Sequence, residues 1–247
     1  MPFNYLRLLT GRERTRNGNR QLARYLAFIA GAVNAGGFLA VRQYTSHMSG
    51  LVSTMADNLA LGRLSLLLEG FLAVLSFLAG ATCTSLMVRW ARQRSLRSEY
   101  ALPLVLESVF LFAFGFTGRV FEGRKVLGTV ALLCFTMGLQ NAIVTKISGG
   151  VIRTTHLTGM VTDVGIKFGR VLYGYLGGTP PFANVDIRKL TLLMSLISLF
   201  FGGGVLGALG FYHLGFLFAL PLAATLLVLA ALPVFDDLRV LHPSTKP

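Results

Sequence analysis

The sequence predicts an all-α integral membrane protein, with about six transmembrane helices, two short broken or re-entrant helices and a 3+3 inverted repeat. The first observation is composition: 53% of the 247 residues are hydrophobic and only 13% are charged. A soluble domain carries about 25% charged residues, so this chain lacks the charge to cover its apolar core in water. The other two observations are long apolar stretches and a repeated set of polar motifs.

Six apolar stretches are long enough to cross about 30 Å of hydrocarbon, which takes about 20 helical residues. They are residues 25–41, 64–88, 102–118, 126–144, 190–211 and 214–235. Two further stretches, 49–62 and 158–169, have a helical composition but are too short and too polar to cross alone.

One membrane domain with four segments follows from these stretches. A basic cytoplasmic segment (1–24) precedes a first membrane repeat (25–118), a second membrane repeat (119–235) and a short C-terminal tail (236–247). The first apolar stretch is full length and follows a long polar segment, so no cleavable signal peptide is expected.

The net charge of +13 would suggest nucleic acid in a soluble protein, but the basic residues lie at the ends of apolar stretches. With the N-terminus in the cytoplasm and six crossings, five of the 23 Lys and Arg residues fall outside: Arg42, Arg63, Arg119, Arg124 and Lys125. This distribution is the positive-inside pattern of a bacterial inner-membrane protein. If both short stretches also crossed, the basic loop 89–97 would move outside. Both termini are therefore expected in the cytoplasm, and nucleic acid is not an expected partner.

The internal repeat consists of three pairs of motifs. Residues 31–35 (GAVNA) match 138–142 (GLQNA), residues 47–50 (HMSG) match 156–159 (HLTG), and Gly-Arg at 62–63 matches 169–170. Each copy reads as a helix, an extended polar stretch, a short helix and two more helices. Three crossings per copy is an odd number, so the second copy must be inverted, an architecture that recurs in transporters.

These motifs resemble the YoaK family of uncharacterised bacterial multi-pass membrane proteins, over about residues 25–235. The family's first motif reads Val-Asp-Ala-x-Gly-Phe and then Thr-Gly-Asn, where this chain has VNAGGF at 33–38 and SGL at 49–51. The second motif is better kept, at 138–142 and 154–163. This chain thus has Asn34 where the family carries an acid and Leu51 where it carries an amide, and Ser49 replaces the threonine. The resemblance implies the membrane class and no particular activity.

The polar residues of the repeated motifs are the candidate substrate-binding residues. They are Asn34, His47, Ser49, Gly50, Gln140, Asn141, Thr155, His156, Thr158 and Gly159. The β-branched polar residues at 152–155 disfavour a helix, and Thr155 or Thr158 is expected to cap the helix that follows. Free N–H groups at such a helix start attract anions, and irregular backbone at membrane depth must line a cavity or be buried in protein.

Two alternatives remain open for these motifs. The short helices are either re-entrant or amphipathic and flat on the membrane surface. His47 and His156 either carry protons near neutral pH or are hydrogen-bonded structural residues. No metal site is expected, because neither histidine has a Cys or an acid at ligand spacing.

Acids inside apolar helices are costly and are functional candidates by default. Glu107 lies in the middle of the third apolar stretch and Asp163 one turn into the second short helix, so both are predicted to face the interior and to couple protons or ions. The alternative is a structural pair with an Arg or with hydroxyl groups. Cys83 and Cys134 have no metal-ligand spacing and are expected to be inert.

The function that these features favour is a secondary transporter or permease for a small polar or anionic solute, with a midplane site at the repeat interface. No nucleotide-binding motif is present, so ion or solute gradients would supply the energy, and no cofactor is expected. A non-catalytic scaffold or sensor is the alternative. An intramembrane hydrolase is disfavoured, because Ser49 and Ser148 lack the preceding glycine of Gly-x-Ser-Gly. The chain is therefore not expected to be an enzyme; its expected partners are the lipid bilayer and the solute, with a homodimer left open.

Overall fold

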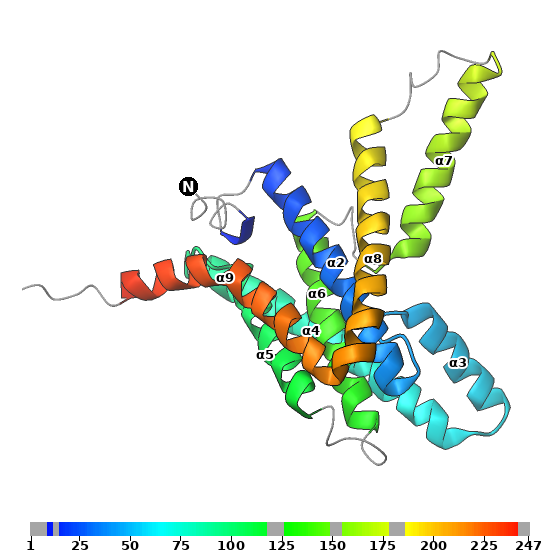
Figure 1. Ribbon diagram of the computed structural model, residues 1–247, viewed down its shortest axis with the longest axis horizontal. Coiled ribbons are helices and arrows are strands. Elements are labelled where there is room, and N and C mark those ends of the chain that lie inside the picture. The colour runs from blue at the N-terminus through cyan, green and yellow to red at the C-terminus, as the bar shows by residue number, and fades with distance from the viewer. Residues whose placement is uncertain (1–8, 12–14, 118–125, 149–154, 178–185, 242–247) are drawn as a thin grey trace, which may run out of the picture.

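The computed structural model describes residues 9–11, 15–117, 126–148, 155–177 and 186–241. Among these residues, all regular secondary structure is helical. The helices are α2 (Arg16–Val41), α3 (Met48–Ala60), α4 (Leu64–Gln93), α5 (Ala101–Thr117), α6 (Val126–Ile147), α7 (Leu157–Tyr175), α8 (Ile187–Leu214) and α9 (Ala219–Leu241), with the 3-10 helix η1 (Gly215–Phe218) before α9. The long helices cross one another as a bundle, from which α3 and α7 project (Figure 1). The all-α prediction is confirmed.

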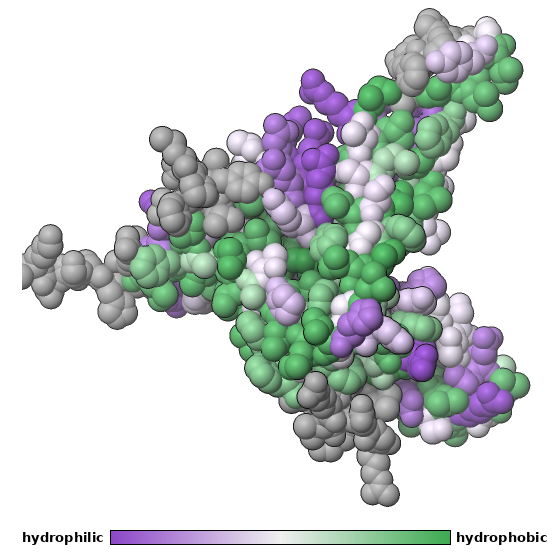
Figure 2. Space-filling view, viewed as in Figure 1, coloured by the Kyte–Doolittle hydropathy of each residue, from purple (hydrophilic) through white to green (hydrophobic). Residues whose placement is uncertain are grey.

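Four described stretches are long and apolar enough to cross a membrane. They are Arg16–Val41, Leu64–Gln93, Leu127–Ile147 and Ile187–Leu238, the last of which contains both α8 and most of α9. A shorter apolar helix covers Ala101–Phe116. Figure 2 shows hydrophobic side chains over most of the visible face, with hydrophilic ones gathered at the N-terminal end of α2 and around α3. Apolar helices with an apolar outer surface indicate a membrane protein.

The helices α7 and α3 are less alike than the sequence predicts. The predicted short helix 158–169 continues to Tyr175, so the pair Gly169-Arg170 lies inside α7. The expected counterpart of this pair, Gly62-Arg63, is in a turn. There Gly62 has φ +70° and Arg63 immediately precedes the first residue of α4. The predicted end of the second short helix at residue 169 is therefore wrong, because a single helical glycine weakens a helix without ending it.

The helices α2 and α9 extend into the predicted N-terminal segment and the predicted C-terminal tail. The helix α2 begins inside the predicted basic segment 1–24, where the Thr15 hydroxyl accepts a hydrogen bond from the Gly18 N–H at 3.0 Å. The helix α9 continues beyond residue 235 into the predicted tail. There the Asp237 carboxylate accepts hydrogen bonds from the Arg97 and Ser98 N–H groups at 3.0 and 2.9 Å. The end of α9 therefore holds the connection between α4 and α5.

The bundle is built from three main helix pairs, α2 with α8, α4 with α6, and α5 with α9. In the first pair the backbones touch at two glycines. A Cβ atom on Gly31 would overlap the Phe200 carbonyl oxygen, and one on Gly203 would overlap the Phe28 carbonyl oxygen. Only glycine permits this approach, which is how membrane helices gain packing contacts without a hydrophobic driving force.

The pair α4 and α6 repeats this contact with its own residues. A Cβ atom on Gly80 would overlap the Phe135 carbonyl oxygen, and one on Gly138 would overlap that of Phe77. In all four helices the glycine follows a phenylalanine by three residues, so each helix carries a Phe-x-x-Gly motif at its crossing point. The two helix pairs are therefore held by the same kind of backbone contact.

Candidate functional site

Two helix starts with the same local structure define the candidate site. The N-caps are His47 for α3 and His156 for α7, and neither histidine makes a side-chain capping bond. Each imidazole instead lies over the third residue of its helix: a Cβ atom on Gly50 would be 2.6 Å from His47 Nδ1, and one on Gly159 would be 2.5 Å from His156 Nδ1. The glycine in each His-x-x-Gly motif makes room for the ring of the preceding histidine. The predicted capping role of Thr155 or Thr158 is therefore wrong.

A hydrogen bond to an asparagine fixes the position of each helix start. The Ser46 hydroxyl donates to Asn34 Oδ1 of α2 at 2.9 Å. The Thr155 hydroxyl donates to Asn141 Oδ1 of α6 at 2.8 Å, and the Asn141 amide donates to the Met137 carbonyl oxygen at 2.8 Å. Because Ser46 and Thr155 directly precede the two N-cap histidines, these bonds tie α3 to α2 and α7 to α6.

Both helix starts open into one cavity of about 730 Å³, which we call the polar cavity. Its lining comes from the start of α3, from α4, from α6 and from the start of α7: Ser46, His47, Met48, Ser49, Phe77, Ala81, Ser85, Asn141, Ala142, Thr145, Lys146, Thr155, His156 and Thr158. From this cavity α3 and α7 run in different directions, so their starts are closer together than their ends (Figure 1).

Six of the ten predicted substrate-binding residues line the polar cavity: His47, Ser49, Asn141, Thr155, His156 and Thr158. Segments more than 100 residues apart in the chain are thus brought to one place. Gly50 and Gly159 lie in the first helical turns beside it, under the histidine rings.

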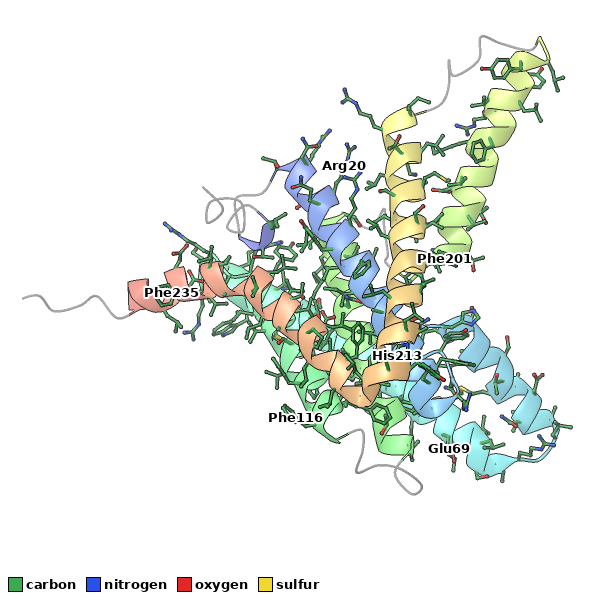
Figure 3. All side chains as sticks on the ribbon, viewed as in Figure 1. Arg20, Glu69, Phe116, Phe201, His213 and Phe235 are labelled. Carbon is green, nitrogen blue, oxygen red and sulfur yellow. The ribbon has the colours of Figure 1, made fainter. Side chains whose placement is uncertain are left out.

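Asn34 and Gln140 lie elsewhere. Asn34 lines a second cavity of about 530 Å³, between α2, α7 and α8. We call it the apolar cavity, because its other lining residues are Gly31, Ala35, Phe38, Leu39, Tyr44, Leu157, Val161, Ile197, Phe200, Phe201, Gly204, Val205 and Ala208. Figure 3 labels Phe201 on α8, near the start of α7. Gln140 is fully buried and donates from Nε2 to the Leu26 carbonyl oxygen at 3.3 Å, so it joins α6 to α2.

The two candidate coupling acids have different surroundings. Glu107 is 1% exposed, as predicted, and its Oε2 has no hydrogen-bond partner among the described residues. Asp163 is not enclosed: its side chain is 44% exposed and pairs with Lys189 of α8 at 3.2 Å. Asp163 therefore has a structural partner, and Glu107 is the acid whose burial the described contacts do not explain.

Three residues that line the polar cavity are not singled out by the sequence patterns: Lys146, Ser85 and Thr145. Lys146 was counted as a loop charge because it follows the predicted helix end at residue 144, but α6 continues through Ile147 and carries Lys146 into the cavity. Ser85 and Thr145 lie in apolar helices, where a hydroxyl usually bonds to the carbonyl oxygen four residues earlier. Thr145 does so, to Asn141 at 2.7 Å, and neither residue stands out in the sequence.

The Asn141–Thr155 bond leads to a test of how α7 is held. Substituting Asn141 with Ala should destabilise the protein by about 1–3 kcal/mol, because it leaves buried partners unsatisfied. Thr155→Val should cost less, and the double variant should be no less stable than Asn141→Ala alone. Hydrogen exchange at residues 157–160 should rise in each variant. Additive losses of stability would mean that the bond does not position α7.

No curated protein and no solved structure matches the chain. A family model described as "Protein of unknown function (DUF1275)" matches residues 22–232. This match begins within α2, ends within α9 and includes every residue that lines the two cavities. It extends over nearly the same region as the resemblance in the sequence motifs, and it assigns no activity. The chain therefore belongs to the DUF1275 family.

Proposed function

We propose that the chain is a secondary transporter or permease of the bacterial inner membrane, and that it binds a small polar or anionic solute in the polar cavity. One observation carries the proposal: His47 and Ser49 from the first half meet His156 and Thr158 from the second half in the same cavity. A concave site with a few convergent polar groups is the usual form of a small-molecule site, and transporters place it where two repeats meet.

The matching contacts of the two halves support an inverted 3+3 repeat. In this arrangement α2, α4 and α5 cross in the first copy and α6, α8 and α9 in the second, while α3 and α7 enter part of the way. The Phe-x-x-Gly contacts of α2 with α8 and of α6 with α4 are then the same contact made twice. The segments 101–104 and 219–222, at the starts of α5 and α9, both read Ala-Leu-Pro-Leu, which extends the repeat to the third helix of each copy.

The two cavities are then repeat-related as well. Residues Phe77, Ala81 and Ser85 of α4 correspond to Phe200, Gly204 and Ala208 of α8, and Asn141, Ala142 and Thr145 of α6 correspond to Asn34, Ala35 and Phe38 of α2. An inverted pair of cavities, one toward each side of the membrane, is what alternating access by rocking of one repeat against the other requires. The glycine contacts of α2 with α8 and of α4 with α6 would act as the pivots of this motion. Glu107 would take up the coupled proton.

Cysteine labelling in intact cells tests the topology. Figure 3 shows Arg20 at the upper side and Phe116 at the lower side of the helix bundle. We expect Arg63→Cys, in the turn after α3, to react from outside, and Arg94→Cys and Leu176→Cys, at the ends of α4 and α7, to react only from inside. All three residues are exposed. Labelling of Arg94→Cys from outside, or of Arg63→Cys and Leu176→Cys from the same side, would remove the inverted-repeat arrangement.

Uptake into vesicles tests the transport proposal. Purified protein in liposomes should accumulate at least one small polar or anionic solute under a pH gradient. The variant Ser85→Trp should abolish that uptake while keeping the thermal midpoint, because Ser85 is half-buried in the wall of the polar cavity and a large side chain there fills it. Ser76→Trp is the matched control, on the same helix but outside both cavities. Absence of uptake for every solute, with no solute raising the thermal midpoint, would favour a scaffold instead.

A further inference from the structure

The charged groups around the polar cavity are of one sign. Lys146 lines it, and no Asp or Glu is among the described residues that do. Lys146 also forms no ion pair with a described residue, whereas Lys189 and Arg92 each pair with an acid. Lys146 is exposed, so its ammonium group is available to a ligand that supplies the negative charge.

The helix starts add donors on the same cavity. The first-turn N–H groups of α3 and α7 receive no side-chain cap, and the Ser49 and Thr158 side chains are exposed to the cavity. The partial positive charge of two helix N-termini thus adds to that of Lys146. His47 and His156 place an imidazole at each start, and both rings are exposed. The Lys146 ammonium group, the two imidazoles and the backbone N–H groups can together bind an oxyanion.

Part of the lining of the polar cavity is apolar. Phe77, Met48, Ala81 and Ala142 form part of the wall, and Phe77 is half-buried there. The volume of about 730 Å³ is within the range of sites for organic molecules, and is large compared with the roughly 30 Å³ that one water occupies in the liquid. An inorganic anion would leave the apolar wall without a partner.

We infer that the ligand of the polar cavity is a small organic carboxylate, with its carboxylate bound by Lys146 and the helix starts and its apolar body against Phe77. This inference rests on the proposed solute site and specifies the class of solute. The repeat-related apolar cavity explains why only one of the two would bind it: Leu39 stands where the polar cavity has Lys146, and Phe38 where it has Thr145.

Binding of defined probes to the purified full-length protein tests the assignment. Benzoate and hexanoate should raise the thermal midpoint and bind with a measurable Kd, while benzamide and hexanamide should bind roughly tenfold or more weakly. Inorganic phosphate should not compete. Lys146→Met keeps the aliphatic stem and should weaken benzoate binding by a similar factor without changing weak benzamide binding. Arg63→Met, which removes an exposed charge outside the cavity, should leave both unchanged.

The outcomes separate this inference from the proposed function. Three results would overturn the carboxylate assignment: equal binding of acid and amide, failure of both carboxylates to bind, or unchanged benzoate affinity in Lys146→Met. If some other solute then binds and Ser85→Trp abolishes that binding, the cavity remains the solute site. If benzoate binds and Ser85→Trp leaves its affinity unchanged, the ligand lies elsewhere and the inference is also overturned.

Discussion

Alanine at Gly203 is expected to be among the most damaging single changes in this chain. Its Cβ would overlap the Phe28 carbonyl oxygen, and backbone cannot move aside as a flexible side chain does. The helices α2 and α8 would have to separate along their whole contact, at a cost of about 1–3 kcal/mol or more. A loss of 3 kcal/mol lowers the thermal midpoint of a protein of this size by roughly 6–12 °C. Thermal unfolding in detergent, with the yield of monodisperse protein, measures the effect.

Gly202 provides a control one residue away. A Cβ there would meet nothing within 4 Å, so Gly202→Ala gains helix propensity without a clash. It should leave the midpoint unchanged or raise stability by about 0.5–1 kcal/mol. The same comparison exists on α6, where Gly138→Ala should destabilise and Gly128→Ala should not. Similar losses for Gly203→Ala and Gly202→Ala would show that the close helix contact does not support the fold.

The sequence alone predicted the helical architecture and much of the polar cavity, because both depend on patterns that recur along the chain. Apolar stretches of spanning length predict helices directly. The His-x-x-Gly motifs identified both helix starts, since a polar motif copied between apolar helices has few places to lie except in a cavity.

Two candidate binding residues that lie outside the polar cavity show what a pattern cannot determine. Asn34 and Gln140 are polar residues inside apolar helices, and such a residue either faces a cavity or bonds to a neighbouring helix. Which of these occurs depends on the rotation of the helix and on which helix lies beside the residue, and the sequence pattern shows neither. The length of α7 was underestimated because the predicted helix ended at Gly169, whereas α7 continues through it and a Cβ there would meet nothing within 4 Å.

Lys146 shows a further limit of sequence patterns. A charge at the end of an apolar stretch counts toward orientation in the membrane, and that count does not distinguish a loop residue from one in the last helical turn. Here one additional turn of α6 converts a topology signal into a charged group in the cavity.

Glutamine at position 107 should remove the pH dependence of solute uptake while keeping the fold. Glu107 is 1% exposed on α5, and its Oε2 has no hydrogen-bond partner among the described residues. An ionised carboxylate there would be a buried charge without compensation, which costs several kcal/mol. Glutamine has nearly the same shape and no charge, so the thermal midpoint should stay within about 2 °C of that of the unmodified protein, an expected change of less than about 1 kcal/mol.

Glu69→Gln is the matched control, because Glu69 is exposed near the start of α4, where Figure 3 labels it. Uptake into vesicles at external pH values between 5 and 8 should vary with pH for the unmodified protein and for Glu69→Gln, and should be flat or absent for Glu107→Gln.

A structural role for Glu107 predicts the opposite pair of results. If Glu107 serves only to bond α5 to a neighbouring helix, glutamine removes an acceptor and leaves a buried group unsatisfied, which costs about 1–3 kcal/mol. The thermal midpoint would then fall by several degrees, and uptake would keep its pH dependence. Because stability and pH dependence change in opposite ways under the two roles, one variant measured by both methods decides between them.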